Sequence, residues 1–174
     1  MDILYIVMPA YNEEKNIENV VKAWYPIVEK HNANGKSRLL IINDGSRDNT
    51  SIMGKKLMKE YPLLEMIDKP NSGHGPTVIY AYDYAIKAGT DYIFQTDSDG
   101  QTNPDEFEVF WEMRNQYDGI FGERSVRGDG KSRAFVEKVV CLLLHLYFGV
   151  KVPDANAPFR LMKSSVVKKY LYKM

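Results

Sequence analysis

The sequence has little cysteine, no excess of either charge and no long apolar run. Its 174 residues include one cysteine, Cys141, which excludes an intramolecular disulfide framework and fits a reducing compartment. Cys141 lies in an apolar run without a charged neighbour, so we expect a core thiol rather than a nucleophile. Basic and acidic residues number 23 each, so no general field favours nucleic acid as a partner.

No segment reaches the roughly 18–20 apolar residues that a transmembrane helix needs. The longest candidate, residues 139–150, has 12 residues and is interrupted by His145. Met1 and Asp2 lead directly into a strand-like run, so we expect no signal peptide. These absences predict a soluble chain located in the cytoplasm.

Several catalytic signatures are also missing from the sequence. There is no Gly-x-Ser-x-Gly elbow, which leaves a serine hydrolase unsupported. There is no paired His/Glu helix motif and no cysteine cluster, which leaves a zinc hydrolase unsupported. The glycine-containing turn at residues 71–75 lacks the lysine of a phosphate-binding loop.

Strand-like and helical patterns alternate along the chain. Apolar, β-prone runs occupy residues 3–8, 38–42, 63–67 and 92–96. Apolar residues at helical spacing follow these runs, and a fifth strand is predicted at 118–123 and a later helix at 134–148. The alternation predicts an α/β fold, with a mainly parallel central sheet flanked by helices, in a single domain spanning residues 1–174.

Local signals at the helix ends give finer expectations. Asn12 or an adjacent residue is predicted to cap the first helix, with Glu13 and Glu14 in its first turn. Pro26 is predicted to kink that helix or to end it early. Asp48, or Thr50 two residues later, is predicted to cap the second helix.

Polar and loop-forming residues follow three of the predicted strands. They are Pro9, Tyr11 and Glu13; Asp44 and Gly45; and Asp97, Ser98 and Asp99. In parallel sheets, ligands bind outside the carboxyl ends of the strands, so these residues should converge on one edge. Two carboxylates spaced i, i+2 after a buried strand are hard oxygen ligands suited to a divalent cation and the phosphates of a ligand.

Two other interpretations of these residues compete with that one. Gln95, Asp97, Asp99, Gly100 and Glu106 approach the spacing of an EF-hand calcium loop. The first position is an amide rather than aspartate, and the incoming segment is strand-like, so both features disfavour calcium binding. A solvated turn after each strand is the simpler alternative, with Asp44 and Gly45 forming a tight corner.

Three motifs, each after a predicted strand, resemble those of inverting family 2 glycosyltransferases with the GT-A fold. They are residues 7–14 (Val-Met-Pro-Ala-Tyr-Asn-Glu-Glu), 43–46 (Asn-Asp-Gly-Ser) and 97–99 (Asp-Ser-Asp). The resemblance spans residues 3 to about 163. It is closest to the dolichol-phosphate mannose synthase-like and undecaprenyl-phosphate sugar transferase branch, through residues 97–101, 122–127 and 154–160.

The resemblance implies a nucleotide-diphosphate sugar as donor, with uracil or guanine as the base, and Mg²⁺ or Mn²⁺ as cofactor. The donor nucleotide would contact Pro9, Ala10, Tyr11, Glu13, Asp44, Gly73 and Asp97. The metal would be held by Asp97 and Asp99. His74 is a further candidate donor contact.

The acceptor side rests on the resemblance as well. Asp154 is the candidate base, with Arg124 and Arg160 as the other catalytic candidates. Gln101, Arg124 and Arg127 are expected near the acceptor phosphate. The favoured acceptor is a polyprenyl phosphate in cell-envelope glycan assembly, which implies peripheral contact with the cytoplasmic face of the membrane.

Two features depart from that branch and leave alternatives open. Pro158 stands where the pattern has glycine, and the chain stops at Met174, where many members continue into transmembrane helices. We therefore expect a domain shortened at its C-terminal end relative to the family. The alternatives are transfer to a saccharide or a lipid, or a non-catalytic domain that binds a nucleotide sugar or a metal.

Overall fold

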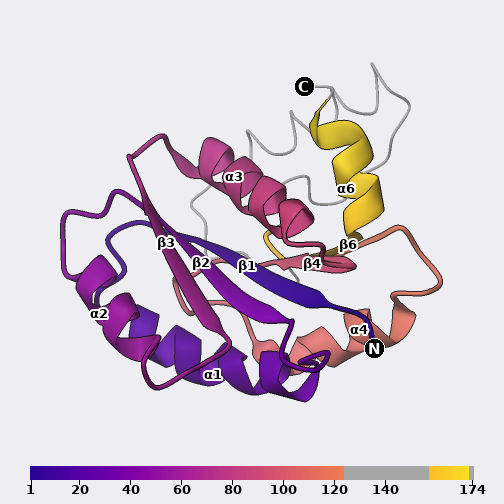
Figure 1. The fold of residues 1–174 in the computed structure, drawn as a ribbon, viewed down its shortest axis with the longest axis horizontal. Helices are drawn as coiled ribbons and strands as arrows, with labels where there is room; N and C mark the ends of the chain where they lie inside the picture. The colour runs from indigo at the N-terminus through magenta and orange to yellow at the C-terminus, as the bar shows by residue number, and fades with distance from the viewer. Residues whose placement is uncertain (124–156, 173–174) are drawn as a thin grey trace.

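The computed structural model describes residues 1–123 and 157–172. In these residues one sheet has the strand order β3-β2-β1-β4-β6-β5 (Figure 1). Its strands are β1 (Leu4–Ala10), β2 (Arg38–Asp44), β3 (Leu64–Lys69), β4 (Tyr92–Gln95), β5 (Gly119–Phe121) and β6 (Arg160–Lys163). The helices are α1 (Ile17–Lys30), α2 (Thr50–Leu57), α3 (His74–Lys87), the 3-10 turn η1 (Pro104–Glu106), α4 (Phe107–Met113) and α6 (Ser164–Leu171).

The sheet is mainly parallel, as predicted. β1 pairs in parallel with β2 and β4, and β2 pairs in parallel with β3. β6 runs antiparallel to both β4 and β5. The direction of strand addition reverses between β1 and β4, and such a switch point is where open α/β sheets bind ligands.

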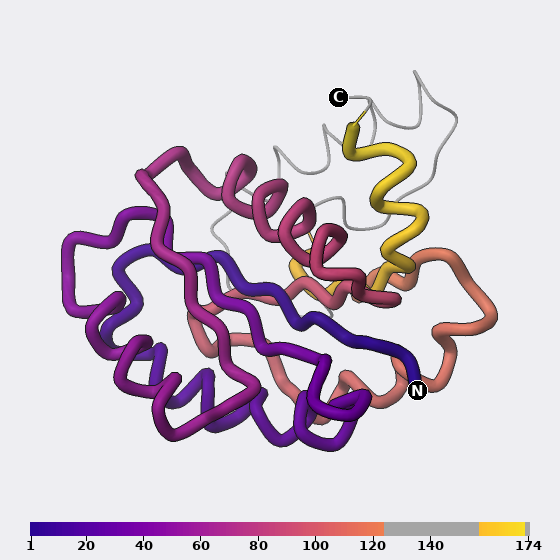
Figure 2. Tube along the Cα trace, in the orientation of Figure 1, coloured from indigo at the N-terminus to yellow at the C-terminus, as the bar shows by residue number. Residues whose placement is uncertain are grey.

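Helices cover both faces of the sheet. Figure 1 shows α1, α2 and α4 on one face and α3 and α6 on the other. The Cα trace in Figure 2 shows the last helix returning beside α3, and the two helices are in contact. This three-layer arrangement confirms the prediction of an α/β domain with flanking helices.

The two faces carry separate hydrophobic cores because side chains alternate along a strand. On β1, Leu4, Ile6 and Met8 belong to the core under α1 and α4. Tyr5 and Val7 point the other way, into the core under α3. The larger core also contains an aromatic cluster formed by Trp24, Phe94, Phe107 and Phe159.

The first helix corrects two predictions. It begins at Ile17 rather than at Glu13, because Glu13 and Glu14 bind the β2–α2 loop instead. The amide of Glu13 donates to Thr50 Oγ1 at 2.8 Å, and a carboxylate oxygen of Glu14 accepts from the amide of Asn49 at 3.0 Å. Asn12, predicted to be a cap, has φ +57° and lies well before the helix.

Pro26 does not end α1, which continues to Lys30. The amide of His31 still donates to the carbonyl of Ile27 at 3.0 Å, one residue beyond the proline. Pro26 has no N–H to donate to the carbonyl of Lys22, four residues earlier. Both residues are exposed, so that carbonyl can bind water instead. A proline on the solvent side of an amphipathic helix is therefore tolerated here.

Three further predictions concern the start of α2, membrane-spanning helices, and residues that the structure does not describe. The N-cap of α2 is Asn49 rather than Asp48 or Thr50, and its side chain makes no capping hydrogen bond, but Asp48 Oδ1 accepts from the amide of Thr50 at 3.0 Å. In residues 1–123 and 157–172, no helix is long and apolar enough to cross a membrane. The predicted helix at 134–148 and Cys141 lie outside the described residues.

Candidate functional site

A cavity of about 500 Å³ opens at the carboxyl ends of β1, β2 and β4, beside the switch point. The residues that line it come from the loops after these strands and from the start of α3. They are Pro9, Ala10, Tyr11, Glu13, Asp44, Asn71, Gly73, His74, Thr77, Asp97, Ser98 and Asp99. The structure thus brings together all seven residues predicted to contact a nucleotide and both predicted metal ligands.

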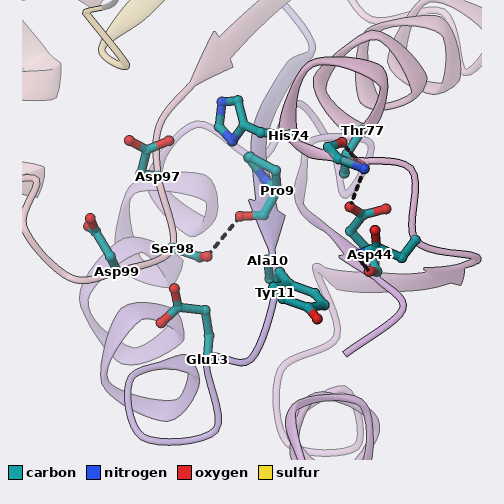
Figure 3. A pocket seen from close by; sticks show the side chains of 12 residues that line it. Pro9, Ala10, Tyr11, Glu13, Asp44, His74, Thr77, Asp97, Ser98 and Asp99 are labelled. Atoms are coloured by element: carbon teal, nitrogen blue, oxygen red, sulfur yellow. Dashed lines mark hydrogen bonds between the residues drawn. The ribbon is translucent and has the colours of Figure 1, made fainter. Parts of the chain in front are cut away.

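The end of β1 forms the floor of the cavity. Ser98 Oγ donates to the carbonyl of Pro9 at 2.7 Å, which ties the aspartate loop to β1 (Figure 3). Beyond Pro9 the chain turns, and the ring of Tyr11 is 44% exposed. An aromatic face left open beside a polar cavity is suited to stacking against a flat ligand.

Three carboxylates lie on one side of this floor. Figure 3 shows Glu13, Asp97 and Asp99 around a common space, with Asp44 on the opposite side of Pro9. Asp99 is held by its own turn, since its Oδ1 accepts from the amide of Gln101 at 2.9 Å. Glu13 Oε2 accepts from Asn16 Nδ2 at 2.7 Å.

The pKa of Glu13 is raised above its ordinary value. Burial is the largest cause, and the negative charges of Asp99, Asp48 and Asp97 add to it, against the hydrogen bond from Asn16. The acidic side of the cavity therefore carries an excess of negative charge that a bound cation would offset.

The donor atoms present fit a hard divalent cation bound together with a ligand. In the described parts of the chain, no three His, Cys, Asp or Glu side chains are gathered closely enough to hold a metal ion by themselves. Mg²⁺ ordinarily takes one or two protein carboxylates and completes its shell with water and phosphate oxygens. Asp97 and Asp99 could supply these carboxylates, with water and the oxygens of a ligand supplying the rest.

On the other side of the cavity, Asp44 is only 4% exposed and is held by the loop that leads into α3. Its carboxylate accepts from the amides of Ser72 and Gly73, both at 2.9 Å, and forms an ion pair with Lys69. Burial raises the pKa of Asp44, but these hydrogen bonds outweigh it, so the pKa lies below its ordinary value. The carboxylate is therefore ionised at neutral pH.

The residue after Asp44 has to be glycine. Gly45 has φ +65°, and a Cβ there would lie 2.7 Å from the amide nitrogen of Asn71. The close approach lets Asn71 Nδ2 donate to the carbonyl of Asp44 at 2.8 Å. The predicted tight corner at residues 44–45 is thus also a junction with the 69–77 loop.

Two of the predicted acceptor and catalytic residues, Gln101 and Arg160, are among the described residues, and neither lines this cavity. Gln101 lines a neighbouring cavity of about 460 Å³, which shares Asp99 with the first. Arg160 lies on β6, opposite Gln95, and its Nε donates to the carbonyl of Ala157 at 2.6 Å. Asp154, Arg124 and Arg127 lie outside the described residues.

Sequence reasoning missed part of the lining and the lysine behind it. Asn71 and Thr77 line the cavity, and Lys69 binds Asp44, but none of the three is among the predicted contacts, although Asn71 belongs to the glycine-containing turn at residues 71–75. Each lies far from Asp44 in sequence, and only the parallel register of β2 and β3 places Lys69 opposite Asp44. The signal available in the sequence is that Lys69 closely follows one predicted strand and Asp44 closely follows the strand before it.

A Glu13→Gln variant tests the charge on the acidic side. A raised native pKa means that Glu13 costs stability once pH rises above the unfolded value of 4.5, and that this cost is absent at lower pH. Glutamine keeps an oxygen for Asn16 and carries no charge. We expect the melting temperature of the variant, relative to wild type, to rise between about pH 4 and about pH 7 in metal-free buffer.

The matched control for this prediction is Glu112→Gln, at an exposed position of α4 away from the cavity. Its difference from wild type should change little over the same pH range. A Glu13→Gln difference that is flat with pH would contradict the charge cluster.

Solved structures share this fold at low sequence identity. Glucosyl-3-phosphoglycerate synthase from Mycobacterium tuberculosis, in complex with Mn²⁺ and uridine-diphosphate-glucose, matches with a TM-score of 0.69 and 18% identity, over 95% of this chain and 57% of that one. TarS residues 1–349 of S. aureus, in complex with UDP-GlcNAc, matches with a TM-score of 0.61 and 17% identity, over 97% and 47%. The predicted GT-A fold is confirmed by these likenesses.

Curated relatives extend the comparison to sequence. The UDP-N-acetylglucosamine–dolichyl-phosphate N-acetylglucosaminyltransferase of Methanococcus voltae is 32% identical over 190 residues, covering 95% of this chain and 71% of the relative. The dolichyl-phosphate beta-glucosyltransferase ALG5A of Trichomonas vaginalis is 33% identical over 115 residues, 61% of this chain and 33% of the relative. The chain thus spans only part of the length of each.

The resemblance carried by the three motifs is supported by a family model that covers nearly the whole chain. The model, described as glycosyl transferase family 2, matches residues 5–171. It therefore includes the strands of the sheet, the cavity and the final helix. This protein belongs to glycosyl transferase family 2.

Proposed function

We propose that this protein transfers a sugar, with inversion, from a nucleotide-diphosphate sugar to a polyprenyl phosphate. One observation carries the proposal: the cavity of a family 2 chain has an ionised aspartate at one end and three carboxylates at the other. The two ends of a nucleotide sugar would complement the two ends of this cavity. The base offers N–H donors, and the diphosphate carries negative charge that needs a cation.

The nucleotide half would use the β1 and β2 side of the cavity. Asp44 offers a carboxylate oxygen to a ring N–H, and the exposed ring of Tyr11 offers an apolar face to the base. Ala10 and Gly73 have little or no side chain and Pro9 has a compact ring, which leaves room for the nucleoside between them.

The diphosphate half would face Asp97 and Asp99, which would hold Mg²⁺ or Mn²⁺. A cation there would act as a Lewis acid for the leaving diphosphate, whose charge grows as the glycosidic bond breaks. Asp99 is oriented for such a role by the amide of Gln101, and Ser98 ties the loop between the two aspartates to β1.

The favoured acceptor needs no base. A phosphate oxygen is already anionic, so it can form the bond to the anomeric carbon while the bond from that carbon to the diphosphate oxygen breaks. Arg124, Arg127 and Arg160 are the proposed phosphate partners, with Gln101 near them. Support comes from the names of the two curated relatives, both of which are dolichyl-phosphate transferases.

Transfer to a hydroxyl of a saccharide or lipid is the second possibility, and it would need Asp154 as the base. We further propose that the protein works at the cytoplasmic face of the membrane, where polyprenyl phosphates are presented. The segment 134–148, which contains most of the longest apolar run of the chain, would then lie near the acceptor.

A transfer assay tests the proposal. Purified protein is incubated with Mn²⁺, polyprenyl phosphate in detergent and a panel of radiolabelled UDP-, GDP- and CDP-sugars, and label in the organic phase is counted. We expect one donor to give Mn²⁺-dependent lipid-linked product, and the same donor to raise the melting temperature. A specific ligand at a hundredfold excess over Kd should stabilise by about 2.7 kcal/mol.

The outcomes separate the alternatives. Stabilisation by a nucleotide sugar without transfer to any lipid or saccharide acceptor would favour a non-catalytic binding domain. Transfer to a saccharide but not to polyprenyl phosphate would replace the proposed acceptor. A panel in which no nucleotide sugar binds would overturn the proposal.

A further inference from the structure

The carboxylate of Asp44 has little hydrogen-bonding capacity left for a ligand. An ionised carboxylate offers about four acceptor positions, two on each oxygen. Oδ1 accepts from Lys69 Nζ and from the amide of Ser72, which lies 2.9 Å away. Oδ2 accepts from the amide of Gly73 at 2.9 Å. The hydroxyl of Thr77 also lies beside the carboxylate and helps to lower its pKa, but its one proton is donated to the carbonyl of Gly73 at 2.8 Å. One acceptor position therefore remains, on Oδ2, beside the cavity that Asp44 lines.

Lys69 is fixed in place and cannot easily release Oδ1. Its side chain is only 12% exposed. Besides Asp44, its ammonium group donates toward the carbonyl of Pro70 at 2.9 Å, Ser72 Oγ at 2.6 Å and Thr77 Oγ1 at 3.1 Å. Three N–H bonds thus face four acceptors, so the ammonium group has no spare donor for a ligand either.

Nucleobases differ in how many adjacent donors they present to a carboxylate. Uracil and thymine present one ring N–H, flanked by two carbonyl oxygens. Guanine presents a ring N–H and an amino group side by side, which a carboxylate receives by using both of its oxygens. Cytosine has a lone pair at the corresponding ring nitrogen, so an ionised Asp44 would repel it.

We infer that Lys69 is a specificity-determining residue: by filling Oδ1 of Asp44, it leaves one acceptor position, which fits an imide base, uracil or thymine, and not guanine. The inference deepens the proposed function and rests on it, because Asp44 must face the base. It narrows the donor to a UDP- or dTDP-sugar. The lowered pKa of Asp44 supports it, since the group is an acceptor only.

Calorimetric titration with nucleoside diphosphates tests the inference without any transfer step. Wild-type protein with Mn²⁺ is titrated with UDP, dTDP, GDP and CDP. We expect UDP and dTDP to bind about tenfold to a hundredfold more tightly than GDP and CDP, the effect of leaving one buried donor or acceptor unpaired.

A Lys69→Ala variant tests the cause of the preference. It frees a position on Oδ1 and leaves space beside it, so the ratio of the GDP and UDP dissociation constants should fall by about tenfold. Lys55→Ala is the control, because Lys55 also pairs with an aspartate, Asp68, but is 60% exposed and lies away from the cavity. Its ratio should equal that of wild type.

The outcomes separate the inference about Lys69 from the proposed function on which it rests. GDP binding as tightly as UDP would overturn the inference and leave the proposed function standing. Binding of none of the four nucleotides would overturn both. If the folded Lys69→Ala variant prefers UDP as strongly as wild type does, Lys69 does not determine the base specificity. The wild-type series stands as a test even if that variant fails to fold.

Discussion

Replacing Asp99 with asparagine is expected to abolish the Mn²⁺-dependent part of donor binding while leaving the fold intact. Asparagine has nearly the same shape, and its amide oxygen can still accept from the amide of Gln101, so the turn should survive. The lost charge, however, removes one of the two carboxylates proposed to hold the metal. We expect donor affinity in Mn²⁺ to fall at least about a hundredfold, because mutation of outer-shell partners, which do not touch the metal, already costs about tenfold to a hundredfold.

The measurement is calorimetric titration of the protein with a nucleotide sugar that it binds, with and without Mn²⁺. Asp105→Asn is the matched control, because Asp105 is exposed in the η1 turn and does not line the cavity. It should bind the donor as wild type does. Equal affinity of the Asp99→Asn variant and wild type in Mn²⁺ would refute the metal assignment.

The largest effect on stability is expected for Phe94→Ala. Phe94 is fully buried on β4, three residues before Asp97, and its ring centroid lies 4.6 Å from Phe159, 4.9 Å from Phe107 and 5.6 Å from Trp24. Removing the ring leaves a cavity at the centre of this cluster, which costs about 3–5 kcal/mol in free energy of unfolding. For a chain of this length, the melting temperature should fall by roughly 6–20 °C.

Chemical denaturation followed by circular dichroism measures this loss. The control is Val109→Ala on α4, where the side chain is 57% exposed and the expected change is within about 0.5 kcal/mol. If Phe94→Ala costs less than about 1 kcal/mol, the aromatic cluster does not support the strand that carries the aspartates.

The main features of the fold are readable from local patterns. Buried strands contain continuous apolar runs, such as residues 39–42 in β2, and runs of this kind predict the parallel sheet. Parallel pairing then brings the ends of β1, β2 and β4 to one edge, which is why sequence alone is enough to group the nucleotide candidates. Their predicted roles remain proposals.

What the sequence could not supply depends on partners distant along the chain. The predicted start of α1 is wrong because Glu13 and Glu14 contact residues 49–50, and no local rule anticipates a bond across about 35 residues. The antiparallel return of β6 is likewise unreadable, since four residues carry little pattern. The pairing of Lys69 with Asp44 follows only from register, which side-chain alternation fixes in the folded sheet.

The pairing of β6 with β5 has a consequence for how family members can diverge in sequence. The amide of Gly122 donates to the carbonyl of Phe159 at 2.8 Å, so the chain leaves the sheet and rejoins it at adjacent points. Closing a flexible segment between fixed ends costs only about 0.6 kcal/mol for each doubling of its length. Evolution could therefore lengthen, shorten or replace the sequence between Gly122 and Phe159 without disturbing the strands that form the cavity.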